Sequence, residues 1–185
     1  MAATSSVMMP LGTKAPDFKL LDTVTTSMMD LDGLKGRLGT LVMFICNHCP
    51  YVIHIKVQLI AIANSYRSQG INTVAISSND IVNYPQDAPD KMAVLMAEWD
   101  FPFDAYLFDE QQSVARAYQA VCTPDLFLFD DSLQCVYRGR LDGSTPKNDI
   151  AVTGQDLRNA LDDYLASNAI SEVQVPSIGC NIKWK

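Results

Sequence analysis

The chain has 185 residues, of which 48% are hydrophobic and 19% are charged, a composition typical of one soluble globular domain with a full core. Lys and Arg together number 14 against 21 Asp and Glu, so the formal net charge is -7. Because phosphate backbones and anionic lipid surfaces repel a negative protein, we expect neither a nucleic-acid nor a membrane partner.

The amino-terminal stretch and the cysteine content predict a reducing location. "MAATSSVMMPLGTKAPDF" has neither a basic start nor a continuous apolar run, and no uncharged apolar stretch is long enough to span a bilayer. Five cysteines are an odd number at low density, unlike the disulfide framework of small secreted proteins. We therefore expect a cytoplasmic protein and, since no linker or repeat divides it, a single domain over residues 1–185.

The first half of the chain predicts a hairpin and a strand-helix-strand unit. Residues 18–22 (FKLLD) and 27–31 (SMMDL) suggest a small hairpin, and residues 40–45 (TLVMFI) are typical of a strand buried on both faces of a parallel sheet. After Pro50, apolar residues recur mostly at three- and four-residue intervals as far as Tyr66, which predicts a helix ended by Gly70. Residues 72–78 (NTVAISS) then read as a parallel strand joined by a right-handed crossover.

The second half predicts an insertion and a further hairpin. Helical patterns over 90–99 and 111–119 flank a short strand at 105–108, and residues 126–130 and 134–140 suggest an antiparallel pair. Leucines at 157, 161 and 165 mark a closing helix after the cap candidate Thr153. Strands that alternate with helices predict an α/β fold with a central mixed sheet flanked by helices.

The segment Cys46-Asn47-His48-Cys49 lies where the first buried strand ends and the long helix begins. Unpaired N–H groups and the helix dipole favour thiolates at such a position, and protonated His48 can add to the effect. Two cysteines three positions apart on a first turn can close a small disulfide ring. Pro50 fits because the first turn has few paired N–H groups to lose. Redox chemistry is therefore the favoured interpretation of Cys46 and Cys49.

Core packing and metal binding are both weaker interpretations of the cysteine pair. Simple core packing is disfavoured because the intervening Asn and His are poor core residues. A zinc site needs four ligands, usually from two paired clusters, whereas Cys122, Cys135 and Cys180 stand alone and His54 lies a further turn along the helix. We expect no metal and no organic cofactor.

Four polar residues and one cysteine near the expected sheet each allow a structural and a functional role. Arg138 and Arg140 lie at strand spacing on one face, where exposure to solvent is favoured over binding an anion or polarising a peroxide. Asn79 and Asp80 follow a strand at the expected active-site edge, where turn formation is favoured over proton transfer. For Cys180, packing is favoured over a third redox thiol.

Several motifs resemble a known superfamily. "GTKAPDFKLLD", a strand ending in Cys-x-x-Cys, and "TPDLFLFD" are similar to the thioredoxin-like superfamily, and most similar to its peroxiredoxin-like branch related to alkyl hydroperoxide reductase (AhpC/TSA). "CNHCPYV", "SSNDIVNYPQDAPDKM", "YRGRLDGS" and "GCNIKWK" resemble an uncharacterised subfamily of that branch. The resemblance covers nearly the whole chain and implies a thioredoxin-like fold with an N-terminal hairpin extension.

The resemblance also implies residue roles. Cys46 corresponds to the attacking cysteine, Cys49 to the resolving cysteine, and Thr123-Pro124 to the cis-proline that lies beside the pair and presents backbone groups to an extended substrate. The leading hypothesis is a thiol-disulfide oxidoreductase that acts on a protein disulfide and exchanges with a cellular thiol reductant. The sequence makes no prediction of oligomeric state.

Two alternative functions stay open. One is a thiol-dependent, antioxidant peroxidase in which Cys49 attacks peroxide and Cys46 resolves it. In peroxiredoxins the reactive cysteine follows a Pro and a Thr at fixed spacings, and neither residue stands at those positions for either cysteine here. Ile45 and Asn-His also replace the Trp and Gly-Pro of thioredoxins. The other alternative is a non-catalytic binding module with a vestigial pair.

Overall fold

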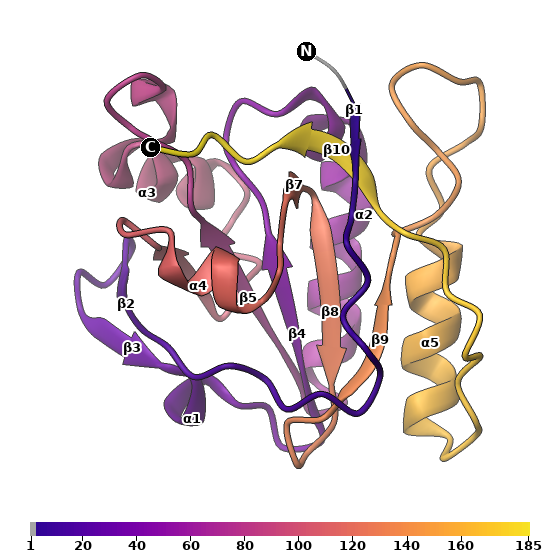
Figure 1. The fold of residues 1–185 in the computed structure, drawn as a ribbon. Coiled ribbons are helices and arrows are strands. Elements are labelled where there is room, and N and C mark those ends of the chain that lie inside the picture. Colours follow the sequence, from indigo (N-terminus) through magenta and orange to yellow (C-terminus); the bar gives the residue numbers. More distant parts are fainter. Residues whose placement is uncertain (1–2) are drawn as a thin grey trace.

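A seven-stranded mixed sheet lies at the centre of the described chain (Figure 1). The computed structural model describes residues 3–185. The sheet has the order β3-β2-β6-β5-β4-β8-β9, in which β4, β5 and β6 are parallel and the other neighbours antiparallel. Its strands are β2 (Lys19–Asp22), β3 (Met28–Asp30), β4 (Gly39–Phe44), β5 (Ile71–Ser77), β6 (Ala105–Phe108), β8 (Asp125–Phe129) and β9 (Cys135–Gly139). The predicted mixed sheet and both predicted hairpins are confirmed.

Strand β4 is central because both of its faces are apolar. All six of its residues are buried, between β5 on one side and β8 on the other. Leu41 and Met43 pack in one buried cluster and Val42 and Phe44 in the other, as the pleat of a strand requires. The sheet therefore separates two layers of core, and the loop that leaves β4 emerges at the carboxyl edge of the parallel strands.

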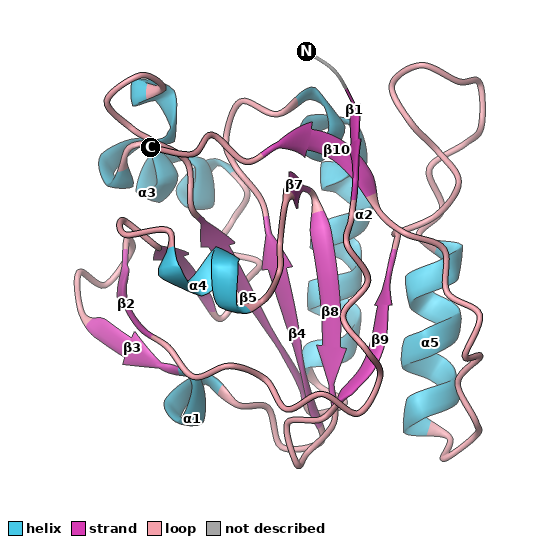
Figure 2. Ribbon diagram, viewed as in Figure 1, coloured by secondary structure: helices cyan, strands magenta, loops and turns pink. Residues whose placement is uncertain are grey.

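Helices cover both faces of the sheet (Figure 2). One face packs against α2 (Pro50–Arg67), α3 (Pro89–Glu98) and α5 (Gln155–Leu165), and the other against α1 (Leu31–Leu34) and α4 (Ser113–Ala117). A single 3-10 turn, η1 (Pro85–Asp87), precedes α3. No helix in the described residues is both long and apolar enough to cross a membrane.

The ends of helices α2 and α5 test the predicted helix start and stop residues. Pro50 stands at the first position of α2, and Gly70 adopts φ 91° just beyond its end, as predicted. The predicted cap of α5 is wrong: Gly154, at φ 72°, is the N-cap, and Thr153 is not. Asp142 accepts from the backbone N–H groups of both Thr153 (2.8 Å) and Gly154 (2.6 Å). Asp142 thus holds the segment before the helix. The first-turn N–H groups of Asp156 (3.1 Å) and Leu157 (3.2 Å) donate to the Leu141 carbonyl, and that of Gln155 donates to the Thr153 hydroxyl (3.3 Å).

A second sheet of three short antiparallel strands was not predicted. It has the order β1-β10-β7 and joins β1 (Ala3–Ser5), β7 (Cys122–Thr123) and β10 (Ile178–Asn181). In Figure 1 the yellow β10 runs between β1 and β7, so segments from both ends of the chain lie side by side. This small sheet carries Thr123 and Cys180.

The expected solvent-facing role of Arg138 is wrong. Its side chain is fully buried, and its Nη2 lies 3.0 Å from Oδ2 of Asp125 and 2.9 Å from Oγ of Ser6. The ring of Phe127 lies 4.2 Å below the guanidinium. Arg140 lies beyond the end of β9 and pairs with Asp156 at the surface. The buried carboxylate explains the difference, because it supplies the counter-charge that a buried guanidinium needs.

Candidate active site

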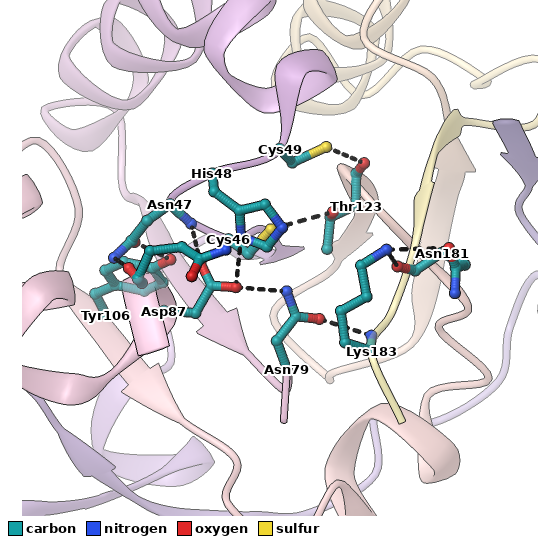
Figure 3. Close-up of polar contacts among 11 residues, drawn as sticks. Cys46, Asn47, His48, Cys49, Asn79, Asp87, Tyr106, Thr123, Asn181 and Lys183 are labelled. Atoms are coloured by element: carbon teal, nitrogen blue, oxygen red, sulfur yellow. Dashed lines mark hydrogen bonds and ion pairs between the residues drawn. The ribbon is translucent and has the colours of Figure 1, made fainter. Parts of the chain in front are cut away.

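The two cysteines of the Cys-x-x-Cys segment lie between β4 and α2, as predicted. Cys49 is the N-cap of α2, and Cys46 belongs to the loop that leaves β4. Figure 3 shows both sulfurs turned toward Thr123. The cysteines thus stand at the carboxyl edge of the sheet, where α/β proteins hold their reactive groups.

Both sulfurs are reduced and closed to solvent. Cys46 is 2% exposed, Cys49 is 0% exposed, and neither forms a disulfide. In its protonated form Cys49 donates to the carbonyl of Thr123 at 3.1 Å, and Cys46 Sγ lies 3.5 Å from the Thr123 hydroxyl. Any bulky reaction partner therefore needs a local opening of the site.

The pKa values of the two thiols shift in opposite directions. A hydrogen bond from Cys46, with help from Thr123 and the N–H of Val52, outweighs burial and lowers the pKa of Cys49 to about 5. The same contact with Cys49, together with burial and the Asp87 carboxylate, raises the pKa of Cys46 well above its usual value. Cys49 is therefore the thiol that ionises more readily.

Thr123-Pro124 is a cis peptide next to the pair, as the resemblance implied. However, the strand β7 that contains Thr123 pairs with β10, and Cys180 lies opposite Thr123. The edge expected to meet an extended substrate is thus occupied by another segment of the same chain.

His48 faces a buried carboxylate that the sequence did not single out. Its Nδ1 lies 2.7 Å from Oδ2 of Asp87, which is itself fully buried at the end of η1. The contact is electrostatic, since no acceptor in the described residues meets this Nδ1 with regular hydrogen-bond geometry. Tyr84 stacks on the other side, with the ring centroids 5.6 Å apart. Carboxylate and aromatic ring together fix the imidazole beside Cys46.

Asp87 also ties the cysteine loop to the strand next to it. Its Oδ1 accepts from the backbone N–H of Asn47 at 2.9 Å, and its Oδ2 accepts from Asn79 Nδ2 at 2.8 Å. In the sequence, Asp87 is indicated only as part of a turn, Pro85-Gln86-Asp87. This turn lies within the motif "SSNDIVNYPQDAPDKM" quoted above. Three polar contacts converge on this one carboxylate (Figure 3).

The residues weighed as turn formers behave differently from each other. Asp80 accepts from the N–H of Val82 at 2.9 Å, so its turn role is confirmed. Asn79 instead links two parts of the site: it donates to Asp87 and accepts from the backbone N–H of Lys183 at 2.8 Å. The segment after β10 is therefore anchored to the loop that carries Asp87.

Three possible metal donors lie together in the described residues. The sulfur of Cys46, a ring nitrogen of His48 and a carboxylate oxygen of Asp87 are all within 4.8 Å of one another. Both oxygens of Asp87 already accept hydrogen bonds from Asn47 and Asn79. The same three groups equally form an arrangement for proton transfer at Cys46.

A cavity of about 200 Å³ borders the cis-proline. It lies between α2, β10 and the loop after β9, and Tyr51, His54, Pro124, Arg140 and Ile178 are among its lining residues. His54, which the sequence left without a role, has Nε2 2.7 Å from Ser144 Oγ. Because that hydroxyl donates to the carbonyl of Ile150 at 2.6 Å, Nε2 is the donor.

Comparisons with known proteins found a family profile and two similar solved structures that match most of the chain. The profile of the AhpC/TSA family matches residues 11–138. An uncharacterized conserved protein from Geobacillus kaustophilus is 49% identical, with a TM-score of 0.97 over 100% of this chain and 97% of that one. A hypothetical protein from Sinorhizobium meliloti is 42% identical, with a TM-score of 0.94 over 98% of both chains.

More distant structures share the fold alone. The thioredoxin domain of a thiol-disulfide oxidoreductase from Bacteroides vulgatus is 17% identical, with a TM-score of 0.65 over 85% of this chain and 99% of that domain. No curated protein matches the sequence. The predicted thioredoxin-like fold is thus confirmed.

Proposed function

The chain belongs to the AhpC/TSA family, and from that membership and the geometry of the cysteine pair we propose that it is a thiol-disulfide oxidoreductase whose redox couple is Cys46 and Cys49. The observation that carries the proposal is the position of both sulfurs beside Thr123 at the start of α2, where Cys46 lowers the pKa of Cys49. A dithiol that loses one proton below neutral pH is suited to exchange, because the thiolate is the reacting species.

In the proposed reaction, the proton of Cys46 first moves to the Cys49 thiolate. The Cys46 thiolate attacks one sulfur of a substrate disulfide, the S–S bond of the substrate breaks, and the departing sulfur leaves as a thiolate that takes up a proton. Cys49 loses its proton, attacks the Cys46 sulfur and releases the second substrate thiol. Two electrons pass to the substrate, and the Cys46–Cys49 disulfide is left.

His48 is the proposed proton carrier at Cys46. A ring nitrogen of His48 lies within 4.8 Å of the Cys46 sulfur, and Asp87 lies 2.7 Å from Nδ1. The carboxylate holds the ring in place beside Cys46 for this transfer. Asp87 acts through His48 and is therefore a positioning residue.

The proposed substrate is a protein disulfide, and a cellular thiol returns the oxidised pair to the dithiol. Side chains next to the substrate disulfide would dock in the cavity beside Pro124, which Tyr51 and Ile178 border. Such binding requires the covered pair to open. The chemistry uses the chain's own sulfurs and needs no organic cofactor, and a reducing compartment such as the cytoplasm would supply the thiol reductant.

Insulin reduction with dithiothreitol as the electron source tests the proposal. We expect activity in the native protein and its loss in Cys46→Ser and in Cys49→Ser. Cys135→Ser is the matched control, because Cys135 is equally buried but belongs to the cluster on the opposite face of the sheet. A Cys46→Ser protein that reduced insulin at the native rate would overturn the proposal.

A peroxidase is the second candidate, because the charged sulfur of Cys49 lies in a closed site that a small oxidant enters more readily than a protein. The Cys49 thiolate would attack one peroxide oxygen, the O–O bond would break, and an alcohol or water would leave. Cys46 would then condense with the Cys49 sulfenic acid and release water. Stopped-flow oxidation that survives Cys46→Ser and disappears in Cys49→Ser would favour this candidate.

A redox titration with mass mapping of all five cysteines separates both enzymes from a non-catalytic binding module. Either enzyme forms a Cys46–Cys49 disulfide at a defined potential. A binding module with a vestigial pair forms none at any potential.

A further inference from the structure

The thiol of Cys180 lies at the cysteine pair, although the sequence favoured a packing role for it. Cys180 is a residue of β10, is 4% exposed, and belongs to the same buried cluster as Cys46 and Cys49. Strand β10 contacts helix α2, whose N-cap is Cys49. A residue from far along the chain thus reaches the first turn of α2.

Thr123 forms the bridge between Cys49 and Cys180. Cys49 donates to the carbonyl of Thr123 at 3.1 Å, and Cys180 lies opposite Thr123 in the β10–β7 register. The strands approach so closely because residue 179 is glycine: a Cβ there would lie 2.0 Å from the Thr123 carbonyl oxygen. The backbone of β10 is therefore pressed against the residue that contacts Cys49.

Cys180 and Cys49, both beside Thr123, also affect each other's ionisation. Burial, and then Cys49, raise the pKa of Cys180 to about 11. Cys46 and, to a smaller extent, Cys180 lower the pKa of Cys49. Both neighbouring thiols therefore favour the thiolate of Cys49.

The remaining cysteines of the described chain have carbonyl partners instead. Cys122 donates to the carbonyl of Pro124 and Cys135 to that of Tyr137, each at 3.7 Å. Cys122 neighbours Thr123 on β7 and yet points its sulfur to a backbone oxygen. Cys122 thus lies near the site with its sulfur directed to a carbonyl group.

We propose that Cys180 is a third redox thiol that exchanges with the Cys46–Cys49 disulfide to give a Cys49–Cys180 disulfide and free Cys46. The inference rests on the proposed function, which supplies the first disulfide. Cys180 gives up its proton and attacks the sulfur of Cys49. The Cys46–Cys49 bond breaks, the Cys49–Cys180 bond forms, and Cys46 leaves as a thiolate that takes up the proton.

The exchange involves no net oxidation, but it changes where the disulfide lies. In the Cys46–Cys49 form the bond joins the loop after β4 to the start of α2. In the Cys49–Cys180 form it joins α2 to β10 and fixes β10 across Thr123. Cys46 then lacks its resolving partner. The protein stays oxidised in this form, with the disulfide between Cys49 and Cys180, and Cys46 cannot complete an exchange with a substrate.

Mass mapping of Cys46→Ala after equilibration in a glutathione redox buffer and acid quenching tests the proposal. With Cys46 absent, we expect Cys49 and Cys180 to form a disulfide and to resist alkylation. Cys46→Ala/Cys122→Ser is the matched control and should give the same disulfide, because Cys122 is buried nearby without a sulfur partner. Cys46→Ala/Cys180→Ser should instead carry glutathione on Cys49.

Two outcomes distinguish failure of this inference from failure of the proposed function. If Cys46→Ala leaves Cys180 open to alkylation while the native protein still forms Cys46–Cys49, the role of Cys180 is wrong and the oxidoreductase stands. If the native protein forms no Cys46–Cys49 disulfide, the proposed function itself is wrong. Should Cys46→Ala fold poorly by circular dichroism, Cys46→Ser gives the same measurement with a smaller change of volume.

Discussion

Nδ1 of His48 lies 2.7 Å from Oδ2 of Asp87, so the histidine inside the cysteine pair faces a buried carboxylate that comes from the segment before α3. The negative charge of Asp87 also disfavours a negative charge on Cys46. The effect of Asp87 on Cys46 is accessible to mutation.

Asp87→Asn should make the Cys46 thiol easier to ionise. In a Cys49→Ala background, which leaves Cys46 as the sulfur to be followed, we expect the pH of half-maximal alkylation to fall when Asp87 is replaced. The reason is that the carboxylate is one of the causes that raise the pKa of Cys46. Asp80→Asn is the control, because Asp80 caps a turn in the neighbouring loop. An unchanged midpoint in Asp87→Asn would contradict the assigned effect.

Asp87→Asn should also cost about 1–3 kcal/mol of unfolding free energy, because an amide N–H₂ at this position must face another donor, either Asn47 N–H or Asn79 Nδ2. Urea unfolding of the reduced proteins measures this cost. A change within error of the native value would show that the buried carboxylate is replaceable.

The Cys49 thiolate should be visible in a spectroscopic titration. The absorbance of the reduced protein near 240 nm should rise with a midpoint at about pH 5, the pKa of Cys49. Cys46→Ala removes the largest cause of that low pKa and should move the midpoint upward toward 9.0, the ordinary value of a cysteine thiol. Cys135→Ser should leave the curve unchanged. A native protein without thiolate absorbance at neutral pH would contradict the lowered pKa of Cys49.

The same thiolate predicts how the stability of the reduced protein depends on pH. Native Cys49 is deprotonated above about pH 5, whereas an unfolded cysteine keeps its proton up to about pH 9. Unfolding therefore takes up a proton between these values, and the free energy of unfolding rises with pH, by at most about 1.4 kcal/mol per pH unit. The raised pKa of Cys46 acts only above this window. Denaturant unfolding should show a gap between native and Cys49→Ala proteins that widens from pH 5 to pH 8.

Arg138→Met should be strongly destabilising, because it leaves Asp125 buried without a counter-charge. We expect a loss of about 3–5 kcal/mol at pH 8. Burial already raises the pKa of Asp125 to about 6, and removal of the cation raises it further, so the carboxyl is neutral at pH 5 and the loss there should be smaller. Urea unfolding at the two pH values measures the difference.

Arg140→Met is the matched control for Arg138→Met. The side chains of Arg140 and Asp156 are each more than a third exposed. We therefore expect the loss of this ion pair to cost less than about 1 kcal/mol of unfolding free energy at either pH. If both variants lost the same unfolding free energy, the buried Arg138–Asp125 pair would contribute no more to stability than the exposed pair.

Gly179→Ala should weaken the packing of β10 against Thr123 and so expose the cysteine pair more often. The new methyl group would lie 2.0 Å from the Thr123 carbonyl oxygen. That oxygen belongs to the backbone and cannot move away by rotation of a side chain. We expect a lower Tm and faster alkylation of Cys49 and Cys180. Gly143→Ala is the control, because a methyl group there meets only the end of the Arg140 side chain at 3.6 Å. Unchanged alkylation in Gly179→Ala would show that β10 does not control access.

Local patterns were sufficient to predict the elements around the cysteine pair. The apolar run of β4 and the spacing of apolar residues after Pro50 depend on near neighbours in the chain, so the sequence alone contains them. The sheet β1-β10-β7 could not be found in this way, because its strands have two to four residues and pair only over long separations. The contact of Cys180 with the site was missed for that reason.

Charged residues were misjudged where the partner lies on another element. Arg138 occupies an alternating strand position that normally faces water. Only the pairing of β8 with β9 brings its guanidinium beside the buried carboxylate of Asp125. Asp87 resembles any acidic residue in a turn until η1 places it against His48. The identities of the cysteines followed from the sequence, whereas the electrostatics that decide which sulfur is charged did not.

The closed state of the pair has a kinetic consequence. Since Cys46 is 2% and Cys49 0% exposed, a bulky oxidant can react only after the site has opened. The observed rate of oxidation should then level off as the oxidant concentration increases, at a plateau equal to the rate of opening. Amide hydrogens of the segment that moves should exchange at that same rate, so exchange in β10 and in η1 would identify which of the two uncovers the sulfurs.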